Sequence, residues 1–246
     1  MDRMLYIAMN GAKQTFLAQA VNNQNLANVS TTGFRADLDA FRTLPVSGPG
    51  FDSRAYATDE SSGSSFAQGT IVTTGNDLDL AINGDGWIAV QALDGTEAFT
   101  RAGDLKVTTT GQLLTRENLP VMGNGGPIAL PPFEDLEIGS DGTLSVLPIG
   151  QAPSTLAVVD RIKLVNPPAG QLEKGKDGLF RTIDGEVQPA DGNVTVIRGS
   201  LERSNVNAIE GLVKMISLAR QYETNIKMMA IAKENDESAA ALIRLQ

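Results

Sequence analysis

The sequence predicts an α+β protein in which long N- and C-terminal helices pair as a coiled-coil-like core, joined by an extended arm to a central all-β module, a hairpin-rich barrel or sandwich. Three observations support this prediction: helical apolar periodicity near both ends of the chain, turn dipeptides between short β-prone runs in the middle, and irregular Gly-, Ser- and Pro-rich sequence between these regions. The expected parts are a helical core domain at residues 1–30 and 205–246, a connecting arm at 31–69 and about 197–204, and a β domain at 70–196.

The first expected helix runs from Met4 to Asn28 and has one apolar face. Residues spaced by three, four or seven positions form this face: Leu5, Met9, Ala12, Phe16, Ala20 and Ala27. The segment has one charged side chain, Lys13, but eight Asn or Gln residues. Because buried amides need hydrogen-bond partners, we expect protein to surround this helix on most sides. Neighbouring subunits would supply such partners more readily than a monomer core, which remains the alternative.

The helix is expected to end at Ser30–Gly33, with Gly33 at positive φ, because glycine adopts that conformation without steric cost. The following residues, to about Gly69, are irregular, contain Pro45, Pro49 and the run SSGSSFAQG, and predict extended or loop structure. An arm that packs along a neighbouring molecule is the functional alternative, and composition does not decide between the two.

Between Thr70 and about Val196, short β-prone runs such as TIVTT, WIAVQA and NVTVIRG alternate with turn dipeptides. These dipeptides are Asn83-Gly84, Asp85-Gly86, Asp94-Gly95, Asp141-Gly142, Asp184-Gly185 and Asp191-Gly192. Asn-Gly and Asp-Gly favour type I′ hairpin turns, in which both central residues need positive φ. Their recurrence predicts the all-β module, which we expect to carry the stability of the isolated chain.

A second helix is expected from about Asn207 to the end of the sequence. Asn207 can cap its start, and Glu210, three residues on, can bond back to the cap. Its apolar stripe consists of Ile209, Leu212, Ile216, Ala219, Tyr222, Ile226 and Met229. Isolated helices are marginal in water, so we expect the two terminal helices to pair, burying one stripe of each and leaving other faces for neighbouring chains.

Charge and composition exclude several classes of function. The chain has 246 residues, a net charge of −9, a pI of about 4.6 and no Lys/Arg cluster, so neither nucleic acid nor an anionic membrane is expected as a partner. Cys and His are absent, which removes thiolate nucleophiles, disulfides, the usual general base and the commonest transition-metal ligand. No window approaches the ~20 apolar residues that span a bilayer, and the N-terminus lacks a cleavable signal pattern. We therefore expect no enzyme activity, cofactor, metal or small-molecule substrate.

Individual motifs that could carry chemistry have better structural explanations. Asn83-Gly84-Asp85-Gly86 lacks the carboxylates that an EF-hand loop needs at its first and last positions, so a hairpin turn is expected. Gly123-Asn124-Gly125-Gly126 lacks the Lys-Ser/Thr of a phosphate loop and the spacing of a dinucleotide fingerprint. Asp77 and Asp79 could pair as in glycosidases, but surface carboxylates are the expected role. Trp87, the only Trp, could stack on a sugar, but we expect it to anchor the β core.

Three sequence motifs resemble the flagellar axial proteins of rod and hook. They are NLANVSTTGFR at Asn25–Arg35, the run at Asp77–Leu113 that contains Phe-Thr-Arg-x-Gly, and the run at Gly199–Met229 with Leu-Glu, Ser-Asn-Val and Tyr-Glu-x-Asn. They occur in the family's order over nearly the whole chain. Asp85–Val90 and the short length resemble the proximal-rod type more than the distal-rod type. The alternatives are a distal rod or hook protein or, from another class, a secreted carbohydrate-binding or carbohydrate-acting β protein.

The resemblance implies a structural subunit of the basal-body rod, a tubular helical assembly in the bacterial periplasm whose inner core is lined by the terminal helices. Its partners would be other copies of itself, other proximal rod subunits, the distal rod protein and, during secretion without a cleaved signal, the flagellar type III export apparatus. Residues of both helices and of the first helix end are predicted to form the assembly interface: Leu5, Met9, Ala12, Phe16, Ala20, Asn25, Leu26, Asn28, Gly33, Ile209, Leu212, Ile216, Ala219, Tyr222, Ile226 and Met229.

Overall fold

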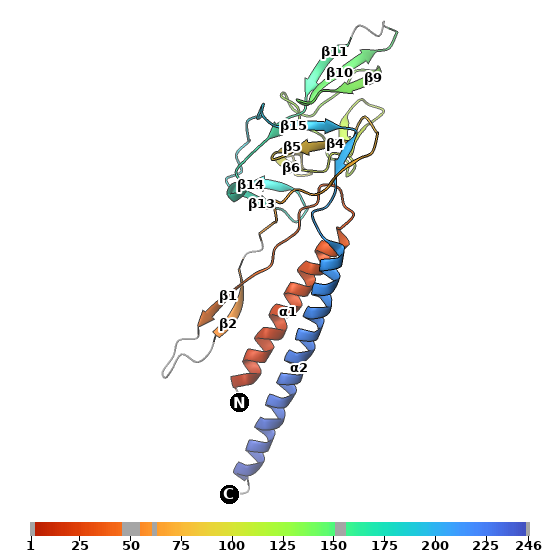
Figure 1. Ribbon diagram of the computed structural model, residues 1–246. Helices are drawn as coiled ribbons and strands as arrows, with labels where there is room; N and C mark the ends of the chain where they lie inside the picture. Colours follow the sequence, from red (N-terminus) through yellow and green to blue (C-terminus); the bar gives the residue numbers. More distant parts are fainter. Residues whose placement is uncertain (1–2, 46–54, 61–62, 151–155, 245–246) are drawn as a thin grey trace. The chain divides into compact units, whose positions relative to one another are not determined.

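The computed structural model describes residues 3–45, 55–60, 63–150 and 156–244 (Figure 1). The chain divides into two compact units. The helical unit comprises Met1–Asn28, Asp37–Ser65 and Val206–Gln246, and the β unit comprises Val29–Ala36 and Phe66–Asn205. The predicted α+β class, with paired terminal helices and a central β-rich region, is confirmed. Residues of the expected connecting arm occur in both units, and its residues 46–54, 61 and 62 lie outside the described residues.

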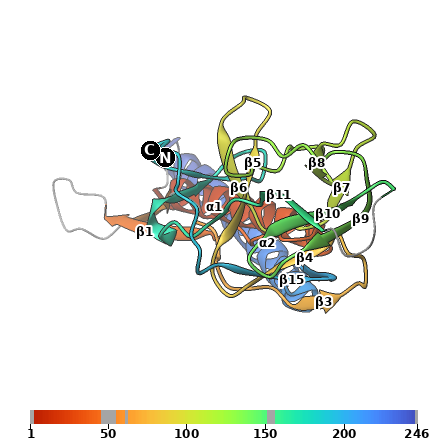
Figure 2. The ribbon, with the colours of Figure 1, turned by 90° about the horizontal axis from the view of Figure 1, so that it is seen from above.

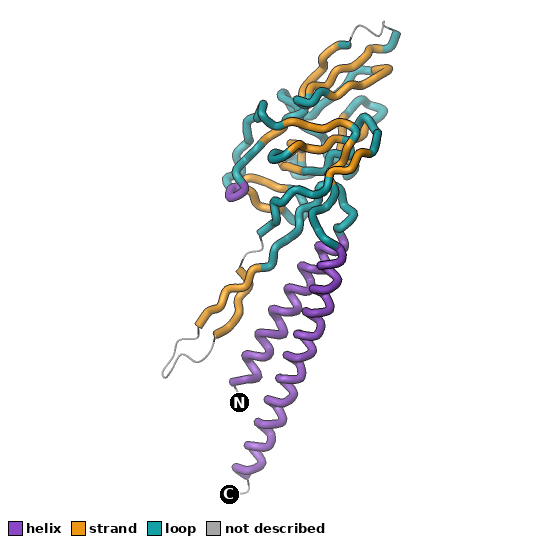
Figure 3. Tube along the Cα trace, in the orientation of Figure 1, coloured by secondary structure: helices purple, strands orange, loops and turns teal. Residues whose placement is uncertain are grey.

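Two long helices dominate the helical unit, α1 (Arg3–Ala27) and α2 (Ala208–Arg244), and they pack side by side in antiparallel directions (Figures 1 and 3). The predicted cap of the second helix is confirmed, because Asn207 Oδ1 accepts hydrogen bonds from the backbone N–H groups of Ile209 at 3.0 Å and Glu210 at 3.4 Å. At the end of α1, the Asn28 side-chain amide donates to the Gln24 carbonyl at 2.9 Å. Both helix ends therefore use local side chains to satisfy backbone groups.

A hairpin of β1 (Ala40–Pro45) and β2 (Ala55–Glu60) completes the helical unit. Side-chain amides of α1 hold its backbone: Ala57 N–H donates to Asn10 Oδ1 at 3.0 Å, and Gln14 Nε2 donates to the Ala57 carbonyl at 2.9 Å. Asn25 exchanges two hydrogen bonds of 2.8 Å with the backbone of Asp37. For these amides the expectation that neighbouring subunits provide partners is wrong. The chain's own arm provides them, because an extended backbone offers donors and acceptors at regular spacing.

The β unit contains small antiparallel sheets. The five-stranded sheet has the order β12-β5-β6-β14-β13, with β12 (Leu164–Val165), β5 (Trp87–Gln91), β6 (Glu97–Thr100), β14 (Phe180–Thr182) and β13 (Leu172–Lys174). A three-stranded sheet has the order β11-β10-β9, with β11 (Ala157–Arg161), β10 (Thr143–Pro148) and β9 (Phe133–Ile138), which lie next to one another in Figure 2. Three further pairs join β15 (Thr195–Arg198) to β4 (Leu80–Asn83), β16 (Ser200–Glu202) to β3 (Ile71–Thr73), and β7 (Leu105–Val107) to β8 (Leu113–Thr115). A single 3₁₀ turn, η1 (Ala169–Gln171), precedes β13.

The β unit has a core of aliphatic side chains from these sheets. Its fully buried members include Leu80, Ile88, Leu113, Leu144 and Leu164. A second, aromatic cluster surrounds Trp87, whose ring centroid lies 4.5 Å from that of Phe180 and 6.1 Å from that of Phe66. The expected role of Trp87 as a core anchor is confirmed.

The hairpin turns differ from the predicted type I′. Five of the described five-residue loops share another pattern of backbone hydrogen bonds. The N–H of the fourth residue donates to the carbonyl of the first, and the N–H of the first residue donates to the carbonyl of the fifth. These loops are 92–96, 108–112, 115–119, 139–143 and 175–179. Only the fourth residue has positive φ in each, for example 84° at both Gly95 and Gly142, and 67° at Asn118. This is a type I turn closed by a G1 bulge, so the Asp before the glycine keeps an ordinary negative φ. Asp94-Gly95 and Asp141-Gly142 therefore indicated turns correctly, but of the wrong type.

The two candidate carboxylates behave differently. Asp77 is a surface residue, as expected, and pairs with Arg198 at 3.1 Å. Asp79 is buried, contrary to expectation. Two hydrogen bonds satisfy its carboxylate there: Thr74 Oγ1 donates at 2.6 Å, and Asn76 Nδ2 donates at 3.0 Å. Both bonds close a local turn. Neither helix, over its described residues, has a stretch long and apolar enough to cross a membrane.

Candidate assembly surface and the buried ion cluster

The two helices pair through small and polar side chains of α1 and through larger, mostly half-buried side chains of α2. On α1 the buried positions facing this pairing are Ala8, Ala12, Thr15, Ala18 and Asn22. On α2 most of the buried and half-buried positions follow a heptad: Gly211, Met215, Leu218, Tyr222, Asn225, Met229 and Ala232. The alternating steps of four and three are those of an antiparallel coiled-coil seam. We call these residues the seam.

Polar contacts cross the seam where the helices approach closely. Asn22 Nδ2 donates to the Gly211 carbonyl at 2.9 Å, and Asn225 Nδ2 lies 3.4 Å from Thr15 Oγ1. A Cβ atom added to Gly11 would lie 3.1 Å from Asn225 Oδ1, tighter than most contacts of that kind. Small residues are therefore needed here, because a larger side chain would push the helices apart.

The expected apolar stripes form the seam only in part, because Ala12, Tyr222 and Met229 belong to it but other members of the stripes are exposed. Met9 is 53% exposed, Phe16 60%, Ile209 75% and Ile216 55%. The expectation that these stripes pair with each other is therefore confirmed only in part, since Phe16, Ile209 and Ile216 point out of the helix pair. Periodicity identified both helices, but hydrophobicity alone did not select the face that pairs.

The structure places the predicted interface residues in three classes. Ala12 and Gly33 are buried; Leu5, Asn25, Leu26, Asn28, Ala219, Tyr222 and Met229 are half-buried; Met9, Phe16, Ala20, Ile209, Leu212, Ile216 and Ile226 are exposed. We call the exposed apolar members other than Ala20 the outward apolar surface. Sequence reasoning missed further exposed apolar residues of the same helices, namely Tyr6, Ile7, Val213 and Ile231, because they interrupt the periodic stripes. Exposed apolar side chains in this number are typical of surfaces that bind protein.

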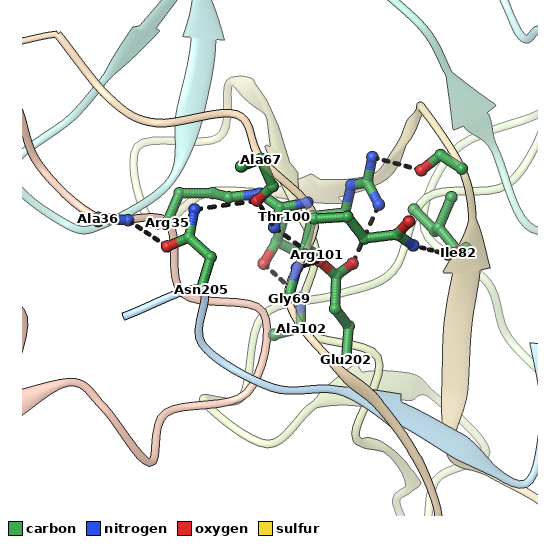
Figure 4. Close-up of polar contacts among 12 residues, drawn as sticks. Arg35, Ala36, Ala67, Gly69, Ile82, Thr100, Arg101, Ala102, Glu202 and Asn205 are labelled. Atoms are coloured by element: carbon green, nitrogen blue, oxygen red, sulfur yellow. Dashed lines mark hydrogen bonds and ion pairs between the residues drawn. The ribbon is translucent and has the colours of Figure 1, made fainter. Parts of the chain in front are cut away.

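The β unit has a different kind of site, an ion cluster that is almost completely buried (Figure 4). Its centre is Glu202, whose side chain is 0% exposed. Oε1 of Glu202 pairs with Arg35 Nη1 at 2.6 Å and accepts from the Gly69 N–H at 2.8 Å. Oε2 accepts from Arg101 Nη1 at 3.0 Å. One carboxylate thus binds two arginines that come from different parts of the chain.

Further contacts of the cluster compensate for the burial of its charges. Arg35 Nη1 also donates to the Ala67 carbonyl at 2.7 Å, and Arg101 Nη2 to the Gly84 carbonyl at 2.9 Å. Both guanidinium groups lie over the ring of Trp87, at 5.9 Å and 5.3 Å from its centroid. Burial lowers the pKa of Arg101, and Glu202 opposes that shift. Buried charges are tolerated when they are paired and hydrogen-bonded in this way.

Gly33 belongs to the β unit and contacts this cluster. Its φ of +66° confirms the predicted positive value, and its N–H donates to the Glu202 carbonyl at 2.8 Å. A Cβ atom at this position would lie 2.3 Å from the Arg101 carbonyl carbon and 2.4 Å from the Ala102 nitrogen. Although Gly33 falls within the expected connecting arm, its turn packs directly on the backbone of the β unit, so this position should affect the stability of that unit.

Sequence reasoning did not name Arg35, Arg101, Glu202 or Asn205 as functional residues. Each lies inside a motif that carried the family resemblance: Gly-Phe-Arg, Phe-Thr-Arg, Leu-Glu and Ser-Asn-Val, respectively. The available signal was therefore the motifs themselves. What the sequence could not show is that residues from three distant motifs contact one another.

Comparison with known proteins agrees with this convergence of motifs. Two family profiles match the chain: "Flagellar hook protein FlgE/F/G D1 domain" over residues 81–146 and "Flagellar basal body rod FlgEFG protein C-terminal" over residues 197–242. Both describe axial components of the bacterial flagellum.

Full-length relatives define the family more closely. The chain is 41% identical to the flagellar basal-body rod protein FlgF of Salmonella typhimurium and equally to that of Escherichia coli, with 100% of each chain covered. It is 31% identical to the rod protein FlgG of Bacillus subtilis, covering 95% of this chain and 96% of that one. The chain therefore belongs to the FlgE/F/G family of flagellar rod and hook proteins. Among these relatives it is more similar to FlgF than to FlgG.

Proposed function

We propose that this protein is a structural subunit of the bacterial flagellar basal-body rod, with the role that the name FlgF describes in its relatives. The observation that carries the proposal is the 41% identity to FlgF proteins over the complete length of both chains. Subunits of this kind assemble helically into the drive shaft of the motile cell. The alternatives of a distal rod or hook protein have less support, since FlgG similarity is lower.

The helical unit supports a role in assembly. Large apolar side chains such as Phe16, Ile209 and Ile216 are exposed on helices that already pair through other side chains. At roughly 25 cal/mol for each Å² of apolar surface removed from water, covering several such side chains would favour association by several kcal/mol. We propose that other copies of this chain and other rod proteins cover the outward apolar surface.

Membership of the family also leads us to propose a location, an export route and a division of the chain into parts. The chain would occupy the proximal part of the periplasmic rod, reach it through the flagellar type III export apparatus without a cleaved signal, and act without catalysis. Its terminal regions, residues 1–30 and 205–246, would form the assembling core. Residues 31–69 and about 197–204 would form a connecting arm, and residues 70–196 would form the β domain. In the predicted interface, the exposed residues would contact neighbouring subunits, and the buried and half-buried residues would hold the exposed ones in place.

Complementation of a Salmonella strain that lacks its own FlgF tests this proposal. We expect the tagged chain to restore swimming at least in part and to copurify with isolated basal bodies. A variant with Phe16→Asp and Ile216→Asp is the matched control, because it should be expressed and folded but absent from basal bodies. Basal bodies that lack the wild-type chain, despite its normal expression, would contradict the proposal.

A further inference from the structure

The chain passes between the β unit and the helical unit at four places, after residues 28, 36, 65 and 205, and we call the last three the exits. Val29–Ala36 leads into the arm, Phe66 begins the return from it, and the segment that ends at Asn205 leads into α2. Each of these segments is bonded to the others within the β unit, close to the residue where it leaves.

Asn205 makes three of these bonds. Its backbone N–H donates to the Phe34 carbonyl at 3.3 Å, and its Oδ1 accepts from the Ala36 N–H at 2.8 Å. Its Nδ2 donates to the Ala67 carbonyl at 2.9 Å. Figure 4 shows the side chain between Ala36 and Ala67, with the amide oxygen turned to one and the amide nitrogen to the other. One side chain therefore joins all three segments, and both ends of its amide are used.

Two neighbouring side chains reinforce this arrangement. Arg35 Nη1 donates to the same Ala67 carbonyl at 2.7 Å, and Lys174 Nζ donates to the Arg35 carbonyl at 2.8 Å. The ammonium group of Lys174 also lies 4.0 Å from the ring centroid of Phe34. These contacts hold the 34–36 backbone within the β unit. Asn205 connects the same backbone to the segment that enters α2.

We propose that Asn205 is a positioning residue that fixes the three exits of the β unit to one another, and that rod assembly requires this fixed arrangement. The inference rests on the proposed function, because it assigns a mechanical task within an assembling subunit. An amide is needed since one of its atoms must accept and the other must donate. Because the Asn205 side chain is not part of the hydrophobic core, its removal should loosen the exits without unfolding the β unit.

Amide hydrogen exchange on the full-length chain, with Asn205→Ala, tests the inference. Loss of the acceptor should accelerate exchange at Ala36 by about tenfold, corresponding to a hydrogen bond of about 1.4 kcal/mol. Exchange at the core amides of Val121 and Leu113 should not change. The same variant should lose incorporation into basal bodies in the complementation strain. Asn205→Asp keeps the acceptor for Ala36 but not the donor to Ala67, so it should retain protection at Ala36 and still lose incorporation.

Asn193→Ala is the matched control, because Asn193 is an exposed asparagine of the same unit bonded only locally, to Asp191. It should change neither readout. Faster exchange at Val121 and Leu113 along with Ala36 would overturn the inference by showing a general role in stability. Unchanged exchange at Ala36, or normal incorporation of Asn205→Ala, would also overturn it. If the wild-type chain does not enter basal bodies, the proposed function fails. In that case hydrogen exchange alone decides whether Asn205 fixes the exits: Asn205→Ala should accelerate exchange at Ala36 and leave exchange at the core amides unchanged.

Discussion

The β unit and the helical unit bury opposite kinds of residue. In the β unit, large aliphatic residues such as Leu80 and Ile88 are fully buried, and even the charged Glu202 has all its partners inside the unit. In the helical unit, alanine, threonine and asparagine are buried, while Phe16 and Ile216 are exposed. The β unit thus satisfies its side chains internally, whereas the helical unit leaves its largest apolar side chains exposed.

Trp87 makes this comparison measurable. It is the only Trp of the chain and lies in the core of the β unit, so its fluorescence reports unfolding of that unit. The helical circular dichroism signal comes from α1 and α2, which belong to the helical unit. Urea titrations followed by both signals can therefore distinguish unfolding of the β unit from unfolding of the helical unit.

Glu202→Gln should have the largest effect, a loss of about 3–5 kcal/mol from the stability of the β unit, because it leaves two buried arginines without a counter-charge. Trp87 fluorescence in a urea titration would measure it. The exposed Glu173→Gln, in the same unit, is the control and should change little. A triple variant, Arg35→Met, Arg101→Met and Glu202→Leu, should recover much of the loss. Equal urea midpoints for Glu202→Gln and wild type would contradict the role of the cluster.

Gly33→Val should destabilise the β unit by about 2–4 kcal/mol, combining the strain of positive φ with overpacking against Arg101. Gly192→Val is the control, because a Cβ atom there meets open space. The Trp87 transition should move to lower urea for Gly33→Val alone. If only the helical signal changed, Gly33 would belong functionally to the arm and not to the β unit.

Ala18→Leu should destabilise the helix pair by about 1–3 kcal/mol, because Ala18 is 1% exposed in the seam and has no room for added atoms. Ala20→Leu, two residues away and exposed, should leave the helical signal unchanged. The helical transition in urea measures both variants, and Trp87 fluorescence should move in neither. Similar effects of the two substitutions would show that the seam is not formed by small residues.

Acid should weaken the β unit slightly through its turns. Hydrogen bonds from Thr96 and Thr143 hold the pKa values of Asp94 and Asp141 below their ordinary values. Groups with a lowered folded pKa stabilise above the unfolded pKa of about 4, and this contribution is lost as the pH falls through the folded pKa. The variant Asp94→Asn/Asp141→Asn should therefore show a shallower loss of thermal stability below about pH 4. The exposed Asp184→Asn is the control and should lose thermal stability with acid as wild type does. If the double variant also lost stability as wild type does, this contribution would be refuted.

The sequence predicted the elements well and their packing less well. The helices, the Asn207 cap and the Gly33 turn depend on local physics, which is readable from spacing and residue type. The seam was not predicted, because in an assembling protein the largest apolar side chains need not face the chain's own core. The ion cluster was not predicted either, since Arg101 and Glu202 are 101 positions apart and only tertiary structure brings them together.

The outward apolar surface should be buried by assembly and not by the folded chain. Ile216→Asp and Ile226→Asp test it most directly, since both positions are exposed, at 55% and 41%. We predict that each variant unfolds in urea like wild type by both signals, yet is missing from basal bodies, because a carboxylate buried at an interface costs several kcal/mol. Incorporation at the wild-type level would contradict the claim, and so would a large loss of stability in the isolated chain.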